Sequence, residues 1–150
     1  MSRTIQHTFF IPQSPEVVWE YLTDSELLSQ WLMKNSFKPE LGYEFQFHTK
    51  PMPKVGFDGI VYCKVIELNK PHKLSYTWVG GMPGKKPNLD SVVTWTLKAI
   101  EGGTELYLEH AGFRGVKNLI GYLAMNSGWK KIGKRIQELI ENQSHGNSAT

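Results

Sequence analysis

The feature that most constrains the fold of this chain is a change in the spacing of its apolar residues. From "YEFQFHTK" (43–50) to "ELYLEHAGF" (105–113), apolar side chains recur at every second position, as in strands that bury one face. Beyond residue 113 they recur about every 3.6 residues, as in an amphipathic helix. The helical stripe consists of Trp129, Ile132, Gly133, Ile136, Leu139 and Ile140. The sequence therefore predicts an antiparallel sheet with one face covered by a C-terminal helix.

Five segments are predicted to form most of this sheet. They are "YEFQFHTK" (43–50), "FDGIVYCKVIEL" (57–68), "PHKLSYTWVG" (71–80), "SVVTWTLKAI" (91–100) and "ELYLEHAGF" (105–113). Unbroken alternation turns one set of side chains inward, and a single bulge would reverse it. The inward set is Tyr43, Phe45, Phe47, Phe57, Gly59, Val61, Cys63, Val65, Leu74, Tyr76, Trp78, Val93, Trp95, Leu97, Leu106, Leu108 and His110. We expect loops at "KPMPKVG" (50–56) and "GGMPGKKPN" (80–88), and a hairpin turn at "EGGT" (101–104).

A strand and two short helices precede this region. "RTIQHTFFI" (3–11) is rich in β-forming residues and ends at a proline. Ser14 is a suitable N-cap with Pro15 at the first helical position, and a second helix restarts at Asp24 or Ser25 and ends at Trp31. Trp19 and Trp31 are expected to pack in the core or at the rim of a cavity and not to take part in chemistry. The last helix is expected to begin before Ser127, with a kink at Gly128, and residues 143–150 to form a frayed tail.

The size and composition of the chain fit one domain, residues 1–150. A chain of 150 residues buries roughly 68–70% of its unfolded surface, and five Trp, six Tyr and seven Phe favour a large core or an apolar cavity. The single cysteine, Cys63, excludes an intramolecular disulfide and fits a reducing compartment. The sequence contains no signal-peptide-like apolar region and no run of eighteen apolar residues. We expect a cytoplasmic protein without a membrane span.

Several segments, taken in order, resemble those of a known family. They are "SPEVVWEYLTDSELLSQWL" (14–32), "KLSYTW" (73–78), "VVTWTL" (92–97), "GGTELYLEHAGF" (102–113) and "SGWKKIGKRIQELI" (127–140). This set resembles the activator of heat-shock-protein-90 ATPase-like domains of the START/SRPBCC superfamily. The resemblance implies an α+β helix-grip fold, in which a curved antiparallel sheet wraps around a long C-terminal helix. It also implies a cavity between sheet and helix for apolar small molecules, or a chaperone partner and a role in the stress response.

A set of residues on the strands and the last helix is predicted to line this cavity. The set is Phe45, Phe47, Tyr76, Trp78, Trp95, Leu108, His110, Trp129, Ile132, Gly133 and Ile136. Within it, Tyr76 and His110 would be the polar groups that orient a ligand. The alternative is that the same side chains fill the space under the helix and leave no room for a ligand.

The sequence allows two roles for His110. Strand parity turns its imidazole toward the interior, where it could act as a general acid or base. Alternatively it hydrogen-bonds a neighbouring group and only stabilises the strand end. We expect the structural role, and assign no catalytic residue.

The remaining polar residues do not predict a metal, cofactor or nucleic-acid site. The five histidines, His7, His48, His72, His110 and His145, show no metal-ligand spacing. Cys63 is expected to be a buried small hydrophobe. Lys130, Lys131, Lys134 and Arg135 fit a solvated helix face better than a nucleic-acid surface, because no aromatic residues interleave with them.

Three functions remain open at this point. The leading hypothesis is non-catalytic binding of a small hydrophobic or amphipathic molecule between sheet and helix. The alternatives are a chaperone-associated interaction domain and a cyclase-like enzyme acting on an aromatic or polyketide-type substrate. A filled core would favour the interaction domain, and an open pocket with several polar groups would favour the enzyme. The sequence does not define the oligomeric state.

Overall fold

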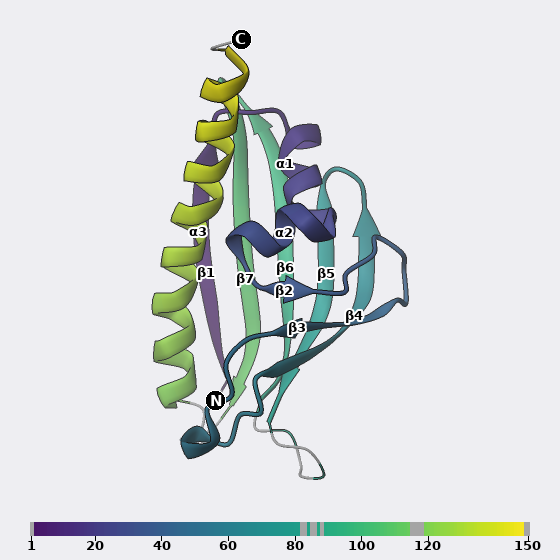
Figure 1. Ribbon diagram of the computed structural model, residues 1–150, viewed down its shortest axis with the longest axis vertical. Helices are drawn as coiled ribbons and strands as arrows, with labels where there is room; N and C mark the ends of the chain where they lie inside the picture. Colours follow the sequence, from purple (N-terminus) through teal and green to yellow (C-terminus); the bar gives the residue numbers. More distant parts are fainter. Residues whose placement is uncertain (1, 82–83, 85–86, 88, 115–118, 149–150) are drawn as a thin grey trace.

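The computed structural model describes residues 2–81, 84, 87, 89–114 and 119–148. In chain order its elements are β1 (Ser2–Ile11), α1 (Pro15–Thr23), α2 (Ser25–Trp31), β2 (Lys34–Asn35), β3 (Glu44–His48), the 3-10 helix η1 (Pro53–Val55), β4 (Ile60–Asn69), β5 (Lys73–Gly80), β6 (Leu89–Ile100), β7 (Gly103–Arg114) and α3 (Leu119–Ser148). The strands form one sheet with the order β1-β7-β6-β5-β4-β3-β2, and all pairs are antiparallel. The sheet curls around the helices on its inner face (Figure 1). This arrangement confirms the predicted α+β class.

The two short helices form where the sequence predicts them. Ser14 Oγ accepts a hydrogen bond from the Val17 backbone N–H at 3.4 Å, and Asp24 Oδ1 accepts one from Leu27 at 3.1 Å. Each bond satisfies an N–H group that the first helical turn leaves without a partner. The Trp31 indole N–H donates to the Tyr21 carbonyl at 2.9 Å and ties α2 to α1. Trp31 is therefore part of the core, as expected.

The strand alternation survives in the four central strands. The predicted inward residues of β4 to β7 are buried: Val61, Cys63, Val65, Leu74, Tyr76, Trp78, Val93, Trp95, Leu97, Leu106, Leu108 and His110. The register shifts once between Val65 and Glu67 in the β4–β5 pair, beyond the last inward residue of β4. The hairpin at 101–104 is also confirmed by the pairing of Ile100 with Gly103.

The segment before β4 differs from the prediction. Residues 57–59 do not continue the strand, because Gly59 has a φ of +86° and its backbone lies close to the Thr49 carbonyl. Phe57 instead forms an isolated bridge with Met52 across η1, which occupies part of the predicted loop. In the other predicted loop, positions 82, 83, 85, 86 and 88 lie outside the described residues.

α3 attaches along β1, one edge of the sheet. His7 Nε2 and Asn126 Oδ1 lie 2.8 Å apart, and the Gln137 amide donates to the Phe10 carbonyl at 2.8 Å. Gly133 faces the same strand. Trp129, Ile136 and Ile140 of the apolar stripe of α3 are buried. α3 is continuous past Gly128 and extends to Ser148, into the segment predicted as a tail, while residues 149–150 lie outside the described part.

Candidate functional site

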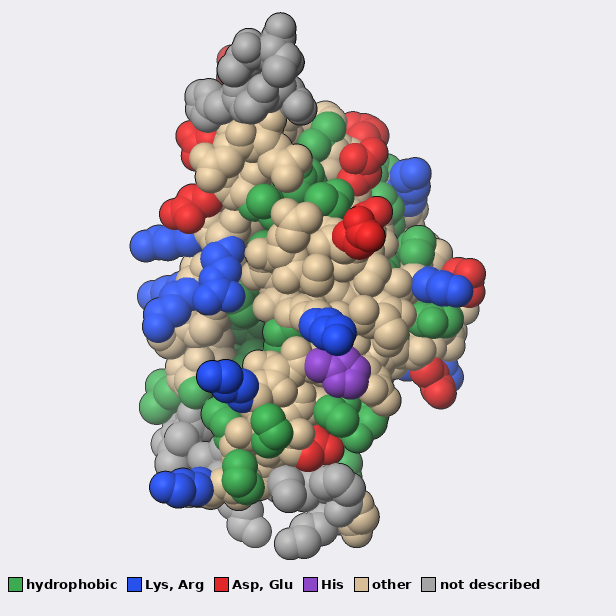
Figure 2. Space-filling view, viewed as in Figure 1, with side chains coloured by type: hydrophobic (Ala, Val, Ile, Leu, Met, Phe, Trp, Pro, Cys, Tyr) green, Lys and Arg blue, Asp and Glu red, His purple; other side chains and the backbone are tan. Residues whose placement is uncertain are grey.

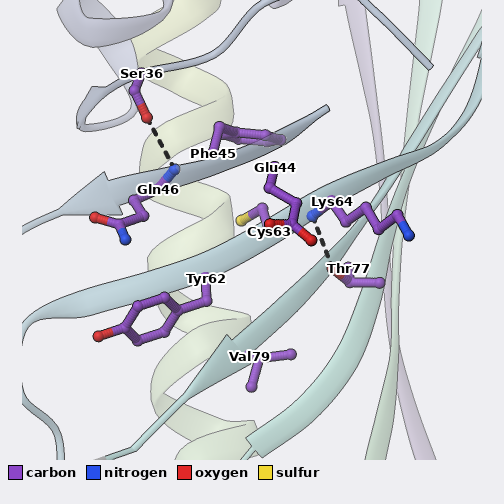
Figure 3. Close-up of a pocket in the computed structure, with 9 residues that line it drawn as sticks. All are labelled: Ser36, Glu44, Phe45, Gln46, Tyr62, Cys63, Lys64, Thr77 and Val79. Carbon is purple, nitrogen blue, oxygen red and sulfur yellow. Dashed lines mark hydrogen bonds between the residues drawn. The ribbon is translucent and has the colours of Figure 1, made fainter. Parts of the chain in front are cut away.

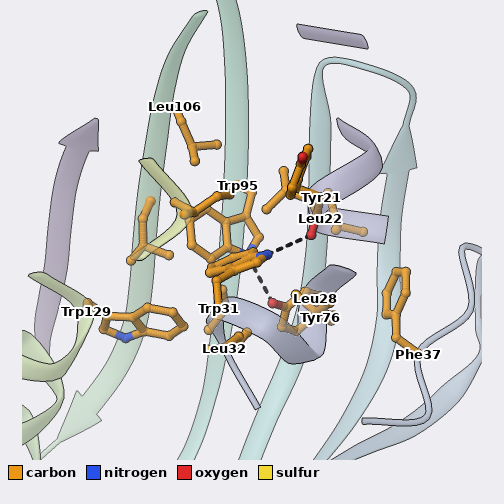
Figure 4. Close-up of a cluster of buried hydrophobic side chains, with 14 of the residues drawn as sticks. Tyr21, Leu22, Leu28, Trp31, Leu32, Phe37, Tyr76, Trp95, Leu106 and Trp129 are labelled. Carbon is orange, nitrogen blue, oxygen red and sulfur yellow. Dashed lines mark hydrogen bonds between the residues drawn. The ribbon is translucent and has the colours of Figure 1, made fainter. Parts of the chain in front are cut away.

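Aromatic side chains fill the space between the sheet and helices α2 and α3 (Figure 4). The Trp129 ring of α3 lies 5.6 Å from the Trp95 ring and 5.4 Å from the Trp78 ring, measured between centroids. Trp31 of α2 contacts Trp95 edge-on at 5.7 Å. Separations of this size are direct ring-to-ring contacts. The four tryptophans, Trp31, Trp78, Trp95 and Trp129, form one continuous layer, which we call the aromatic floor.

The residues predicted to line a cavity come together on the inner face of the sheet. Ten of the eleven are buried: Phe45, Phe47, Tyr76, Trp78, Trp95, Leu108, His110, Trp129, Gly133 and Ile136. Ile132 is partly buried. The rings of the set contact one another, for example Phe47 and Trp78 at 5.3 Å. The buried members therefore pack as core in this structure.

The cavity hypothesis predicts open space beside Gly133, but the structure places the Phe9 ring there. A side-chain carbon at this position would overlap the ring of Phe9 on β1. The absence of a side chain lets the helix approach β1 closely. Gly133 is therefore a close-packing position between α3 and β1.

His110 lies at the centre of a buried chain of hydrogen bonds. The Trp129 indole N–H donates to His110 Nδ1 at 3.0 Å. His110 Nε2 lies 2.8 Å from Ser91 Oγ, and this hydroxyl donates to the Trp78 carbonyl at 2.7 Å. The chain connects α3, β7, β6 and β5 without relying on the backbone ladder of the sheet.

The partners of the imidazole define its protonation. An indole nitrogen can only donate, so Nδ1 must accept, and Nε2 carries the proton and donates to Ser91. The ring has no exposed surface, and burial lowers the pKa of His110 to about 3. His110 is therefore a neutral structural link, and both its ring nitrogens are bonded to protein groups.

The other buried titratable groups are also held neutral. The Trp95 indole N–H donates to the Tyr76 hydroxyl at 3.0 Å, and burial raises the pKa of Tyr76 above its usual value. Burial likewise raises the pKa of the Cys63 thiol, which keeps it from forming the reactive thiolate. Cys63 thus behaves as the small hydrophobe that its strand position predicts.

A recess with hydrophobic walls lies beside α3 on the face that Figure 2 shows. The α3 flank away from β1 carries Met125 and Ile132, which are partly buried against the core, and Gly128. A side-chain carbon at position 128 would meet no atom within 4 Å, so this flank is open. In the same view the segment that joins α2 to β2 lies across from α3 (Figure 1), and its Met33 is partly buried against the core. We call these four residues the recess walls.

Of the recess walls, only Ile132 belongs to the set of residues that the sequence predicts to line a cavity. Met33 lies between two elements, where no periodicity applies. Met125 and Gly128 belong to the predicted helix, but a helical stripe alone does not show which flank meets a neighbouring strand. The hydrogen bonds to β1 identify the packed flank, and the free space beside Gly128 identifies the open one.

A second hollow of about 530 Å³ lies on the outer face of the sheet (Figure 3). It is lined by Ser36, Glu44, Phe45, Gln46, Tyr62, Cys63, Lys64, Thr77 and Val79. Two of its hydroxyls serve the backbone, since Ser36 Oγ accepts from the Gln46 N–H at 3.1 Å and Thr77 Oγ1 from the Lys64 N–H at 2.8 Å. These polar groups therefore stabilise the strands that carry them.

The structure also bears on metal binding and on membrane insertion. Among the residues that the structure describes, no group of three His, Cys, Asp or Glu side chains could hold a metal ion. Within the same part of the chain, no helix is long and apolar enough to cross a membrane.

Several solved structures of other proteins have the same architecture. The protein MLL2253 from Mesorhizobium loti is 32% identical, with a TM-score of 0.82 over 93% of this chain and 98% of that one. The Aha1 dimer structure from Colwellia psychrerythraea is 19% identical, with a TM-score of 0.75 over 93% and 96%. DynU16, a protein of the dynemicin biosynthetic locus, is 18% identical, with a TM-score of 0.74 over 92% of this chain and 47% of that one. These likenesses confirm the helix-grip fold.

A search of curated proteins found no match. A family described as "Activator of Hsp90 ATPase homolog 1-like protein" matches residues 12–141, which include all three helices except the end of α3. This range also contains the aromatic floor and the recess walls. The chain therefore belongs to the family of activator of Hsp90 ATPase homolog 1-like proteins.

Proposed function

We propose that this domain binds a small hydrophobic or amphipathic molecule, without catalysis, in the recess between α3 and the α2–β2 segment. The observation that supports this most directly is the open flank of α3. Partly buried Met125 and Ile132 leave apolar surface beside Gly128, where an added side-chain carbon would meet no atom within 4 Å. Covering such surface is favourable by about 25 cal/mol for each Å² removed from water.

The attachment of α3 along β1 also supports this proposal. Asn126, Gly133 and Gln137 hold the helix against β1, and Trp129 anchors it to His110. These four residues lie on the flank of α3 that faces β1 or at the centre of its apolar stripe. A ligand on the opposite flank therefore displaces none of these contacts. The ligand lies above the aromatic floor and leaves the core packing intact.

Catalysis is disfavoured by the state of the buried polar groups. A general acid or base needs a pKa near the working pH and hydrogen-bond reach to the substrate. His110 is fully enclosed, and both its nitrogens have protein partners. Enzymatic action of the polyketide-cyclase kind through His110 would require the core to open first.

A chaperone-associated interaction role is the second candidate. It is favoured by the filled aromatic core, since a core filled by side chains leaves the surface as the main means of recognition. The family description and the Aha1 structure among the similar proteins point in the same direction. Under this alternative the recess walls would contact a protein segment.

The experiment that tests the proposal is binding of the neutral fluorescent probe Nile red, followed by native mass spectrometry of the purified protein. Gly128→Leu places a side chain in the recess, and we expect it to weaken probe binding about tenfold or more, a loss of about 1.4 kcal/mol. Ser127→Leu is the matched control, because the neighbouring side chain is exposed and points away from the recess. The control should bind the probe like the natural protein.

Two results would contradict the proposal. One is the absence of any probe binding together with no retained small molecule in the mass spectrum. The other is equal loss of binding in Gly128→Leu and Ser127→Leu, which would place the probe elsewhere. Either result would move the interaction role to first place.

A further inference from the structure

We infer that the recess selects an amphiphile with an anionic headgroup, specifically a single long-chain carboxylate molecule. This inference rests on the proposed function and adds the chemistry of the ligand. Its basis is the distribution of charge around the opening. Figure 2 shows that Lys and Arg side chains gather on α3 on one side of the recess, and that a Lys and a His side chain lie on the other.

On the α3 side, Arg135 is an exposed basic residue on the side of the helix that carries the open flank. It lies seven residues, or about two helical turns, after Gly128 and three after Ile132, so the three share one side of the helix. Lys130 and Lys134 are exposed on other sides of the same helix, since Lys130 follows the β1 flank and Lys134 faces outward.

On the opposite side, the basic groups come from the short β2–β3 pair. Lys34 pairs with His48 in the register of these strands, and both side chains are exposed. Lys34 directly follows Met33 of the recess walls. Charge and apolar surface therefore adjoin each other on both sides of the opening, as an amphiphile requires.

These cations are not neutralised by the protein. Within the described residues the only ion pair joins Lys73 and Glu67, next to the β4–β5 turn, and neither Lys34 nor Arg135 takes part in one. A guanidinium presents a planar pair of donors that matches the two oxygens of a carboxylate. A carboxylate at the opening would then meet Arg135 and Lys34 while its chain covers Met125 and Ile132.

The test compares three twelve-carbon ligands that differ only in their headgroups: dodecanoate, dodecanol and dodecylamine, each below its micelle concentration. Displacement of Nile red from the full-length protein should be about tenfold more effective for dodecanoate than for dodecanol, since each exposed charge contact contributes up to about fivefold. Dodecylamine should be weaker than dodecanol. Raising the salt concentration should reduce the preference for dodecanoate.

The double variant Lys34→Gln with Arg135→Gln should bring the ratio of dodecanoate to dodecanol affinity close to one, because it weakens dodecanoate binding more than dodecanol binding. The matched control is Lys130→Gln with Lys134→Gln, which removes the same charge from α3 away from the recess. It should preserve most of the ratio. Isothermal titration calorimetry with dodecanoate checks each affinity directly.

The outcomes distinguish this inference from the proposed function. Binding of all three ligands with equal affinity would overturn the carboxylate selection and retain the apolar site. No binding of any ligand would remove both. An equal effect of the two double variants would assign the preference to overall charge. If dodecanoate does not bind but vesicles with phosphatidylglycerol retain the protein, and Lys34→Gln with Arg135→Gln releases it, the basic groups serve a membrane surface and the inference is wrong.

Discussion

Removal of the indole N–H of Trp129 tests the buried hydrogen-bond chain quantitatively. In Trp129→Phe the aromatic floor keeps a ring, but His110 Nδ1 loses its donor in a site with no exposed surface. An unpaired buried acceptor costs about 1–3 kcal/mol, and the smaller ring adds about 1 kcal/mol of lost packing. We therefore expect the free energy of unfolding to fall by about 2–4 kcal/mol.

The double variant with His110→Leu separates these two contributions. His110→Leu alone leaves the Trp129 N–H unpaired, whereas Ser91 keeps its bond to the Trp78 carbonyl. The double variant has neither orphaned group. Its destabilisation should therefore be smaller than the sum of the single effects by about 1–3 kcal/mol.

Urea unfolding followed by tryptophan fluorescence and by far-ultraviolet circular dichroism gives all three free energies. The two signals should coincide, which supports a two-state analysis. Single-variant effects that add to within about 0.5 kcal/mol would refute the reasoning. In that case the indole and the imidazole would be near neighbours without an energetically important bond.

Two further predictions concern pH and the packing of α3. His110 is neutral in the folded protein because burial lowers its pKa to about 3, and its pKa is higher in the unfolded chain. The free energy of unfolding should therefore fall as the pH drops below about 6.5, by up to about 1.4 kcal/mol per pH unit from this group. Urea unfolding from pH 7 to pH 4 should show this slope, and His110→Gln should reduce it; an equal slope in the variant would contradict the assignment. Gly133→Leu should destabilise the fold by about 1–3 kcal/mol or more through overlap with Phe9, while Gly128→Leu should not. Thermal unfolding compares the two, and equal melting temperatures would show that α3 can move away from β1.

The alternation of apolar residues was sufficient to predict the inner face of the sheet. Tyr76 and Trp78 on β5, and Leu108 and His110 on β7, are buried where period two places them. The caps at Ser14 and Asp24 are local features, and they too were predictable because their partners lie three residues away. These predictions depend only on residues close together in the chain.

The candidate site depends on contacts between distant segments. The bond between Trp129 and His110 needs the exact roll of α3 over the sheet, which a stripe several residues wide does not define. The same roll turns Gly133 toward Phe9 and Gly128 toward open space, although both are glycines in one helix. The strand predicted from residue 57 begins only at Ile60 because Gly59 approaches the Thr49 backbone, a contact that alternation does not reveal.

The attachment of α3 along β1 has a consequence for how such a domain can change through mutation. Residues that hold the helix, such as Asn126, Trp129 and Gly133, contact β1 or the core, whereas Met125, Gly128 and Arg135 do not share those contacts. Substitutions on the second set can therefore alter what is recognised with little loss of folding stability. Under the proposed function, stability and specificity depend on separate sides of a single helix, so new ligand preferences can arise without a compensating change in the core.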